Sequence, residues 1–374
     1  MIFIFWFSCL MAIYHLFFYA VILQVIASVK QMKINVSEDY MPTVTFVTAA
    51  FNEEEYIEEK LQSFANLDYP KDKINLIIVS DNSDDDTNFI VQKYVDKFDN
   101  IRLVIQKTRK GKASALNLIE PKIDSEIVIS TDASSILEKD AVKKMVRHFN
   151  DDSIGLVTGK LKYVKKNNDK SGEGLYWKYE TWIRKNESKV YSVIVASGCL
   201  FAIRRELYKQ IHPSSPDDFE RTLVTLENGY RAIIEPEAVV YEYLTVKTSD
   251  EISRKIRIIS REWFALLRHK ALLNFFKFPI ISLFLISHKL IRWLLPFISI
   301  SIIGSAIFLR SILFMNYFLC VTAILFGFGL LELLLEKNGK SIKLFKVPAY
   351  IIAMNYASSI AFMKFIFRKQ QTIW

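Results

Sequence analysis

Long apolar runs without charged residues constrain this chain more than any other feature of its sequence. Residues 1–29, 293–309 and 311–331 contain no Asp, Glu, Lys or Arg, and a further apolar run at 347–363 follows Lys346. Each run is close to the roughly 20 residues that a helix needs to cross the hydrocarbon core of a bilayer. The sequence therefore predicts four transmembrane helices.

The first apolar run is predicted to stay in the protein as a membrane anchor. It lacks the charged leading segment and the small-residue cleavage site that are typical of a secretory signal. Lys30 and Lys33 follow this run, and four lysines between residues 337 and 346 follow the third. By the positive-inside rule these lysines place the globular part in the cytoplasm, whereas the basic residues after the last run do not fit the rule.

The composition predicts four parts in this chain. Residues 42–269 have an ordinary globular composition and are long enough for one sizeable core. Residues 271–287 are apolar apart from Lys277, which favours a helix lying in the membrane interface. We therefore expect an N-terminal transmembrane helix at 1–29, the globular domain at 42–269, the interfacial helix at 271–287, and a C-terminal transmembrane region with three helices at 288–374.

Cysteine usage and charge narrow the classes of partner. Cys9, Cys199 and Cys320 show no paired spacing, so the sequence indicates neither a disulfide framework nor a zinc site. The net charge of +9 favours anionic headgroups and phosphate-bearing ligands. No nucleic-acid-binding motif is present in the sequence, so we expect no nucleic acid among the partners.

Strand and helix patterns alternate in the first half of the globular part. Short apolar runs predict strands at 43–48, 74–80, 101–106 and 126–130, each followed by a helical pattern. This order is typical of an α/β fold with a mainly parallel sheet and right-handed crossovers. In such sheets ligands bind beyond the carboxyl ends of the strands.

The second half of the globular part is less regular. The pattern predicts a longer strand at 154–164, helices at 174–190 and 217–226, and short late strands at 231–234 and 239–244. We expect this half to carry the acceptor side of the site.

Polar side chains follow three of the predicted strands. Asn52 and Glu53 follow the first, Asp81 the second, and Asp132 the fourth. Carboxylates that gather at the strand ends suit a cation that bridges them to a phosphorylated substrate. Asn52 is also predicted to cap the next helix, with Glu55 as its capping-box partner.

The start of a later helix offers a phosphate site. Gly111 and Lys112 follow a predicted strand and open a helix, where backbone N–H groups and a flexible ammonium can meet phosphate oxygens. In contrast, we interpret Asp84, Asp85 and Asp86 as first-turn acids that the helix macrodipole favours, and we leave them out of the site.

Six segments occur in a fixed order along the globular part: 46–53 (FVTAAFNE), 80–87 (SDNSDDDT), 110–117 (KGKASALN), 131–134 (TDAS), 197–204 (SGCLFAIR) and 217–219 (DDF). They resemble the motif series of membrane-bound, inverting family 2 glycosyltransferases, which have the Rossmann-like GT-A fold. That family includes hyaluronan, chitin and cellulose synthases and many bacterial exopolysaccharide enzymes. The resemblance runs from about residue 42 to residue 269.

The resemblance implies a donor site for a nucleotide-sugar. Asp81 resembles the family's uracil-contacting aspartate, Asn52 and Glu53 would lie beside the nucleoside, and Lys112 would contact phosphate. Asp132 matches the first aspartate of the family's Asp-x-Asp, which supplies carboxylates to Mg²⁺ or Mn²⁺.

This chain departs from the metal motif, because Ser134 takes the second place. Mg²⁺ is commonly held by one or two carboxylates together with substrate phosphates and waters, so we still expect Mg²⁺ or Mn²⁺ with Asp132 as a ligand.

The resemblance also implies the acceptor side. Asp217 and Asp218 match an acidic pair whose second member is the general base, so Asp218 is expected to take the acceptor proton while Asp217 orients it. Ser197, Gly198 and Cys199 resemble the acceptor-side loop, where a glycine lets the backbone approach the sugar.

A basic segment resembles the family's Gln-Arg-x-Arg-Trp motif. Arg257 keeps its arginine, Lys255 stands where the first arginine would be, and both are expected to stabilise the leaving diphosphate. Arg254 replaces the glutamine and shares a helix face with Arg257, so the two could grip the diphosphate together. Alternatively, Arg254 and Arg261 could meet anionic lipid. Ile258 replaces the tryptophan that lies by the acceptor sugar in processive synthases, and this difference favours short products.

Together these features predict a multi-pass enzyme of the cell membrane with a cytoplasmic catalytic domain. It would transfer a sugar, with inversion, from a nucleotide-sugar to a lipid-linked or polysaccharide acceptor, in cell-envelope or exopolysaccharide synthesis. The resemblance implies that the nucleotide-sugar is UDP-linked. Two alternatives stay open: transfer of a single sugar to a polyprenyl phosphate, and a non-catalytic membrane component that binds nucleotide.

Overall fold

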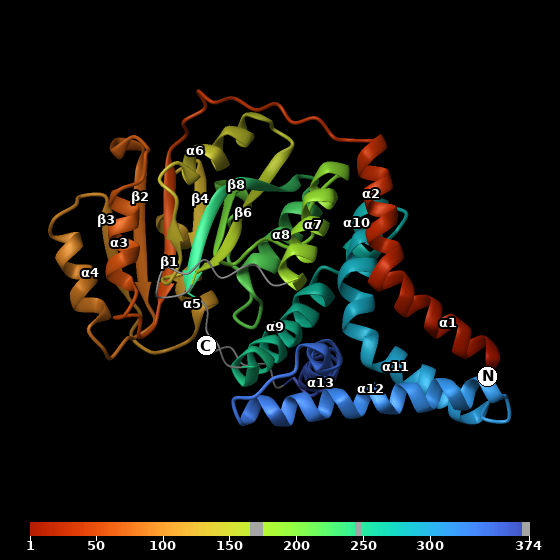
Figure 1. Cartoon of the computed structure of the whole chain (residues 1–374). Helices are drawn as coiled ribbons and strands as arrows, with labels where there is room; N and C mark the ends of the chain where they lie inside the picture. The colour runs from red at the N-terminus through yellow and green to blue at the C-terminus, as the bar shows by residue number, and fades with distance from the viewer. Residues whose placement is uncertain (165–174, 244–247, 369–374) are drawn as a thin grey trace. The chain divides into compact units, whose positions relative to one another are not determined.

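The computed structural model describes residues 1–164, 175–243 and 248–368, and the chain divides into two compact units (Figure 1). The sheet unit consists mainly of Leu23–Thr245 and Phe264–Ser282. The helical unit consists of Met1–Ile22, Val246–Trp263 and Leu283–Gln370. The two units are described separately below.

A mixed sheet forms the core of the sheet unit. Within the described residues its strand order is β3-β2-β1-β4-β7-β6-β8-β5. Pairing is parallel among β3, β2, β1 and β4 and between β6 and β8, whereas β7 is antiparallel to both of its neighbours. The strands are β1 (Val44–Ala50), β2 (Ile74–Ser80), β3 (Ile101–Ile105), β4 (Ile127–Thr131), β5 (Ile136–Leu137), β6 (Ile154–Val164), β7 (Leu200–Arg204) and β8 (Arg231–Tyr243).

Helices flank this sheet (Figure 1). α5 packs against β1 and β2, whereas α6, α7 and α8 pack against β8. On α3 the buried apolar residues Ile57, Leu61 and Phe64 recur at the spacing of one helix face. The helices are α3 (Ile57–Ala65), α4 (Thr87–Val95), α5 (Lys112–Ile119), α6 (Ala141–Val146), α7 (Leu175–Val190) and α8 (Asp217–Glu227).

Two local features differ from the sequence-based expectations. The late strands expected at 231–234 and 239–244 are one strand, β8, whose register against β6 shifts between Thr158 and Lys160. Pro236 lies at that irregularity. Proline has no backbone N–H, and a missing inter-strand hydrogen bond is best tolerated where the pairing is already irregular. The expected capping by Asn52 is also wrong, because α3 begins at Ile57 with no side-chain cap.

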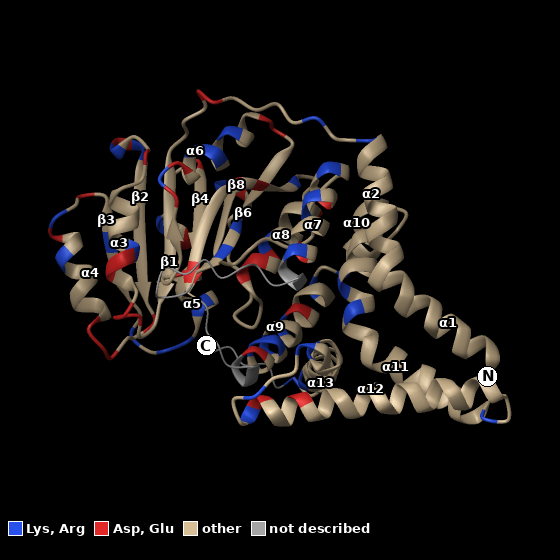
Figure 2. Ribbon diagram, viewed as in Figure 1, with Lys and Arg blue, Asp and Glu red and all other residues tan. Residues whose placement is uncertain are grey.

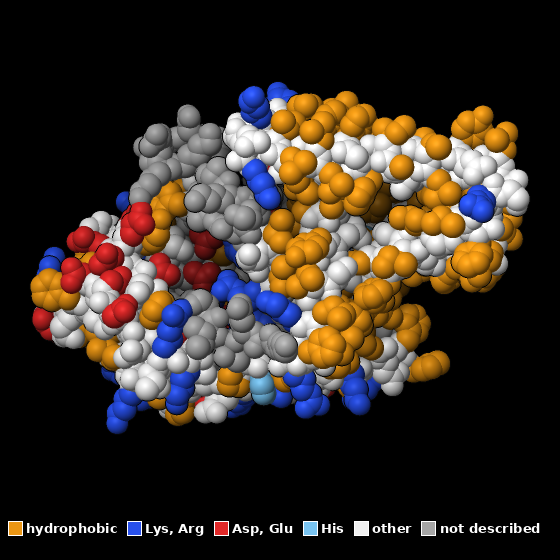
Figure 3. Space-filling model, turned by 90° about the horizontal axis from the view of Figure 1, so that it is seen from below, with side chains coloured by type: hydrophobic (Ala, Val, Ile, Leu, Met, Phe, Trp, Pro, Cys, Tyr) orange, Lys and Arg blue, Asp and Glu red, His pale blue; other side chains and the backbone are white. Residues whose placement is uncertain are grey.

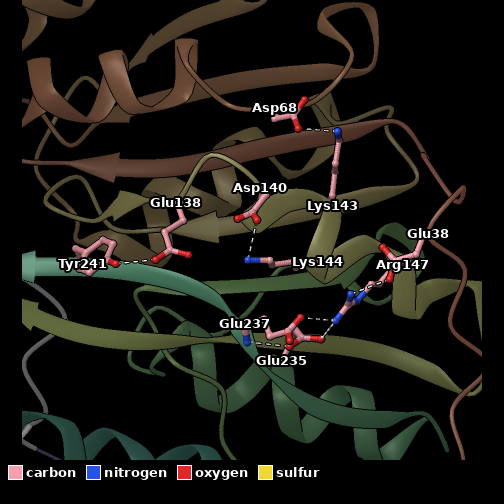
Figure 4. Close-up of polar contacts among 10 residues, drawn as sticks. All are labelled: Glu38, Asp68, Glu138, Asp140, Lys143, Lys144, Arg147, Glu235, Glu237 and Tyr241. Atoms are coloured by element: carbon pink, nitrogen blue, oxygen red, sulfur yellow. Dashed lines mark hydrogen bonds and ion pairs between the residues drawn. The ribbon is translucent and has the colours of Figure 1, made fainter.

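Ion pairs fix the 3-10 turn after α6 (Arg147–Asn150) to β8 (Figure 4). Arg147 contacts Glu38 and Glu235 at 2.8 Å each and Glu237 at 3.0 Å. His148 Nε2 lies 2.6 Å from Glu235 Oε2. Burial alone would raise the pKa of Glu235, but its hydrogen bonds to His148, the Glu237 backbone and Arg147 outweigh burial and lower the pKa to about 2.

Among the described residues, four helices are long and apolar enough to span a membrane: Ile2–Val29, Pro279–Phe308, Leu313–Lys337 and Lys343–Ile366. They agree with the four predicted transmembrane helices. Charged side chains are sparse along them, and apolar side chains cover much of their surface (Figures 2 and 3). The exposed apolar surface of these helices is consistent with membrane association.

The second of these helices begins earlier than the sequence analysis expected. Lys270–Leu273 form a 3-10 turn, and the Asn274 side chain then accepts hydrogen bonds from the amides of Phe276 and Lys277. The helix starts at Pro279 and continues through a π-helical turn into α11 (Ile291–Phe308). Proline at the first helical turn is favoured because its ring fixes φ and no N–H is needed there. The structure therefore differs from the separate interfacial helix expected at 271–287.

Polar groups inside the helical unit are hydrogen bonded to one another. Ser8 and Ser301 hydroxyls lie 2.9 Å apart, and Tyr14 OH lies 2.8 Å from Ser287 Oγ. Lys289 and Glu262 form a buried ion pair at 2.6 Å. Such pairing is needed because hydrocarbon offers no partner to polar side chains.

Candidate active site

The loops after β1 and β2 hold each other through Asn52. Its Nδ2 donates to Asp84 Oδ1 at 2.7 Å, and the Asp84 amide donates back to Asn52 Oδ1 at 3.1 Å. Asp85 Oδ2 accepts the Glu54 amide at 3.1 Å. Asp84 and Asp85, which the sequence analysis left out of the site, therefore shape the loop that carries Asn52 and Glu53.

Asp81 fixes the turn that leads into α5. The residue is fully buried, and its carboxylate accepts hydrogen bonds from Gln106 Nε2 at 2.6 Å, the Lys110 amide at 2.8 Å and the Gly111 amide at 2.7 Å. Gly111 has φ 93°, a left-handed conformation that glycine adopts without strain. Asp81 thereby sets the position of Lys112. The contact of Asp81 with the uracil of the donor stays a prediction.

Lys112 joins the end of β4 to the start of α8. Its Nζ lies 2.6 Å from Asp132 Oδ1 and 3.3 Å from Asp217 Oδ1. Burial would lower the pKa of Lys112, but the charges of Asp132 and Asp217 outweigh burial and raise the pKa above its usual range. The structure therefore brings three of the predicted site residues into direct contact.

Asp217 and Asp218 are adjacent in sequence but differ in their surroundings. Asp217 is 5% exposed and accepts a hydrogen bond from Ser130 Oγ at 3.1 Å. Burial would raise its pKa, yet Lys112 and Arg221 outweigh burial and lower the pKa. Asp218 is half-buried, and its Oδ1 accepts the Phe219 amide at 2.9 Å. Both acids occupy the first turn of α8, where the helix dipole favours negative charge.

The predicted acceptor loop lies directly against the predicted base. A Cβ atom added to Gly198 would meet Asp218 Oδ2 at 3.3 Å. Cys199 O accepts a hydrogen bond from Thr131 Oγ1 at 2.8 Å, so the same loop also touches the residue before Asp132. The 197–199 loop is thus held between the strand end that carries Asp132 and the helix start that carries Asp218.

A glutamate that the sequence analysis missed lies beside Asp132. Within the described ranges, Asp132, Cys199 and Glu242 place their possible ligand atoms within 4.8 Å of one another. Glu242 is buried near the end of β8, and its Oε1 accepts a hydrogen bond from Ser135 Oγ at 2.9 Å. No local pattern singles this glutamate out, because only the pairing of β8 with β5 and β6 brings it to the site.

Other acids close to Asp132 add to the negative charge. Burial, followed by the charges of Asp132, Asp85 and Glu242, raises the pKa of Glu53 to about 7. Glu53, which is predicted to lie beside the donor, is therefore close enough to Asp132 for the charge of Asp132 to raise its pKa.

Lys60 is a second site residue that the sequence analysis missed. It lies on α3, its side chain is 1% exposed, and its Nζ donates hydrogen bonds to Thr131 and Ser135. Burial lowers the pKa of Lys60 to about 7, against the opposing influence of Asp132 and Glu242.

Lys255 and Arg257 lie on α9 (Thr248–Arg268), in the part of that helix that belongs to the helical unit. Their predicted contact with the leaving diphosphate stays a prediction.

A family model described as glycosyl transferase family 2 matches residues 45–212. The chain is 32% identical over 215 residues to the probable glycosyltransferase YdaM of Bacillus subtilis, a match that covers 54% of this chain and 51% of YdaM. It is 37% identical over 131 residues to the poly-beta-1,6-N-acetyl-D-glucosamine synthase of Staphylococcus aureus, covering 35% of this chain and 31% of the synthase. The matches thus span about half, or less, of the length of these relatives.

A solved structure shares the fold over nearly the whole chain. The mannosyltransferase PcManGT from Pyrobaculum calidifontis, in complex with GDP-Man and Mn²⁺, superposes with a TM-score of 0.74 at 24% sequence identity. The match covers 98% of this chain and 99% of that protein.

Proposed function

We propose that this chain is a family 2 glycosyltransferase that moves a sugar, with inversion, from a nucleoside diphosphate donor to a lipid-linked or polysaccharide acceptor. The match of the family model to residues 45–212 and the similarity to YdaM support this proposal. The observation that carries this proposal is the close approach of Gly198 to Asp218, which leaves little room for a Cβ atom and sets an acceptor loop beside a candidate base. Asp217 then links that base through Lys112 to the donor-side Asp132.

On the donor side, the proposal assigns the diphosphate to Lys112 and to the amides at the start of α5. That helix start combines backbone N–H groups with a lysine whose position Asp81 fixes through Gly111. Asn52, Glu53 and Asp81 would surround the nucleoside. We expect a UDP-linked donor. If the protein instead consumed GDP-mannose, the donor held by PcManGT, the assigned nucleoside would be guanosine and the proposed chemistry would stay the same.

The donor atoms beside Asp132 fit a divalent cation such as Mg²⁺ or Mn²⁺. Asp132 and Glu242 would hold it, and Glu242 would supply the second carboxylate that Ser134 does not. Carboxylate oxygens are the ligands that these hard cations prefer, and Cys199 adds a sulfur that Mn²⁺ tolerates better than Mg²⁺. A cation bound there would offset the charge of the donor diphosphate.

On the acceptor side, the proposal assigns proton transfer to Asp218. The acceptor hydroxyl oxygen attacks the anomeric carbon from the face opposite the diphosphate, and its proton passes to the Asp218 carboxylate. The bond between the anomeric carbon and the diphosphate oxygen breaks, and the nucleoside diphosphate leaves. Lys255 and Arg257 would stabilise the charge on the leaving group.

The proposed location is the cell membrane, with the sheet unit in the cytoplasm. The four apolar helices support membrane association, and the lysines after the first and third helices support the orientation. The acceptor would then be met at the membrane surface, in cell-envelope or exopolysaccharide synthesis.

The test is sugar transfer by membranes that contain the full-length chain. Radiolabelled UDP- and GDP-sugars are supplied with and without chelator, and the length of the product is measured on a sizing gel. We expect transfer that needs a divalent cation, and short products because Ile258 replaces the tryptophan of processive synthases.

Asp218→Asn tests the role of the base. We expect it to lower kcat by about 10²–10⁴-fold, the usual contribution of general base catalysis, while donor binding is retained. Asp68→Asn is the control, because Asp68 is an exposed acid that pairs with Lys143 outside the site. An Asp218→Asn protein that folds and keeps full transfer would contradict the assignment.

A further inference from the structure

Lys60 is a buried ammonium in an apolar surrounding. It occupies α3 on the face that also carries Ile57, Leu61 and Phe64, and it is 1% exposed. A charged group at such a position is costly unless hydrogen bonds and opposite charges compensate it. The contacts that compensate it therefore indicate what the lysine does.

The ammonium of Lys60 holds both ends of the turn that presents Asp132. Its Nζ donates to Thr131 Oγ1 at 2.8 Å, directly before Asp132, and to Ser135 O at 2.9 Å, at the end of the turn. The Asp132 carbonyl also accepts the Ser135 amide at 3.2 Å. The turn between residues 131 and 135 is therefore closed over Lys60.

The same contacts extend to the acceptor side. Thr131 Oγ1 accepts from Lys60 and donates to Cys199 O at 2.8 Å. Ser135, whose carbonyl accepts from Lys60, donates through its hydroxyl to Glu242 at 2.9 Å. One buried ammonium thus connects the end of β4, the 197–199 loop and the end of β8.

We propose that Lys60 is a positioning residue for sugar transfer, which keeps the donor-side Asp132 and the acceptor-side 197–199 loop at a fixed separation. This inference rests on the proposed function, because the separation matters only if a donor and an acceptor meet there. Transfer between two bound groups is sensitive to misplacement by about 1 Å, so loss of this support should slow the reaction before it unfolds the protein.

A purely structural lysine offers the contrast. Lys73 also donates its ammonium to a backbone carbonyl, Met41 O at 2.8 Å, but it lies just before β2, at the opposite end of that strand from Asp81. Lys73→Met is therefore the matched control for Lys60→Met. Lys60→Arg serves as a further variant that keeps the charge while it changes the reach and shape of the donor group.

The first measurement is the kinetics of the full-length protein in membranes, normalised to the amount of folded protein. We expect Lys60→Met to lower kcat at least tenfold and to raise the KM for the donor, with a smaller loss in Lys60→Arg and less than a twofold change in Lys73→Met. Kinetic constants of folded Lys60→Met within twofold of the unsubstituted protein would overturn the proposal.

The second measurement is amide hydrogen exchange, which does not depend on activity. In Lys60→Met, and more weakly in Thr131→Val, we expect faster exchange in the 131–135 turn and the 197–199 loop than in the rest of the sheet unit. Thr131→Val keeps the lysine but removes the hydroxyl that accepts from Lys60 and donates to Cys199 O, so it decides the question if Lys60→Met does not fold.

The two measurements also separate this inference from the proposed function. A protein that transfers no sugar from any donor, but whose exchange changes as expected, would refute the proposed function and keep Lys60 as the support of the two segments. Unchanged exchange in both variants would refute the positioning role, whether or not sugar is transferred.

Discussion

Asp217 and Asp218 are identical, adjacent residues whose side chains have different surroundings. Asp217 is buried and paired with Lys112, so its charge is spent on holding the lysine in place. Asp218 is half-buried and lies against Gly198, where an acceptor could approach it. The difference follows from the direction in which the first turn of α8 points each side chain, and pairs of acids with distinct environments are a common basis for acid–base assignments.

Gly198→Ala is predicted to lower kcat. The added Cβ would lie 3.3 Å from Asp218 Oδ2, so the carboxylate or the loop must shift by a few tenths of an ångström. Gly304→Ala is the control, since a Cβ at Gly304 would meet no atom within 4 Å. Steady-state kinetics should show a loss of about tenfold for Gly198→Ala, in line with the sensitivity of transfer to geometry. Equal kinetics for the two variants would contradict the close contact as a functional feature.

Glu242→Gln is predicted to weaken Mn²⁺ binding by tenfold or more, because it removes one of the carboxylates beside Asp132. The measurement is Mn²⁺ titration of the purified protein, followed by electron paramagnetic resonance in the presence of UDP. Adding Ser134→Asp to the Glu242→Gln variant should restore part of the affinity.

Glu138→Gln is the control for Mn²⁺ binding, because Glu138 accepts a hydrogen bond from Tyr241, the residue before Glu242. If Glu242→Gln binds Mn²⁺ as tightly as Glu138→Gln does, the carboxylate of Glu242 is not a ligand.

At the scale of elements, the sequence predicted most strands because their burial is simple. β1 and β2 lie between parallel neighbours, so nearly every residue in them is buried and their sequence reads as a continuous apolar run. The predicted strands at 74–80 and 154–164 have the bounds of β2 and β6. β7 was not predicted: its five residues belong to the 197–204 segment, which was identified by its resemblance to a family motif and not by a strand pattern.

Contacts between distant elements explain the site residues that the sequence analysis missed. Lys60 and Thr131 are 71 residues apart, and Ser135 and Glu242 are 107 residues apart. Local periodicity carries no information about such pairs. Motif resemblance found Asp132, Asp217 and Asp218 because each lies in a segment that resembles a family motif, whereas Lys60 and Glu242 lie in none of these segments.

The ion pairs between β8 and the turn after α6 predict how the stability of the protein depends on pH. Glu235 has its pKa lowered to about 2 from an ordinary value of 4.5, so its contribution to stability is present above about pH 4.5 and is lost as the pH falls toward 2. That contribution is of order 3 kcal/mol at most, since one pKa unit corresponds to about 1.4 kcal/mol.

Thermal melting of Glu235→Gln and the unsubstituted protein should therefore differ most near pH 6 and converge between pH 4.5 and 2. Glu237→Gln is the control, because Glu237 pairs with the same Arg147 but has a side chain that is 62% exposed. A difference between Glu235→Gln and the unsubstituted protein that stays constant over this range would contradict the ionic origin of the effect.

At the scale of the whole molecule, composition was sufficient to predict four membrane helices, because hydrocarbon imposes a length and a lack of charge that a sequence shows directly. The boundary between the parts was harder to predict. The contacts divide α9 between Trp263 and Phe264, whereas the composition assigned residues 42–269 to one domain. An amphipathic helix carries both an apolar and a charged pattern, so composition alone does not assign it to either side.

The chain also contains a tryptophan that the motif comparison could not place. Trp263 lies five residues after Ile258 on α9 and is buried among aromatic rings, with Trp293 at 4.9 Å and Phe365 at 5.7 Å between ring centroids. Its surroundings give it a packing role within the helical unit. The resemblance had assigned the family's tryptophan to the acceptor sugar, and Ile258 occupies that position here.

The pairing of Lys112 with Asp132 and Asp217 has a consequence for turnover. The Lys112 ammonium is already paired with two carboxylates, so under the proposed function an incoming diphosphate would have to compete with them for it. After sugar transfer, Asp132 and Asp217 would pair with Lys112 again and so favour release of the nucleoside diphosphate. This exchange of partners would weaken donor binding and speed product release.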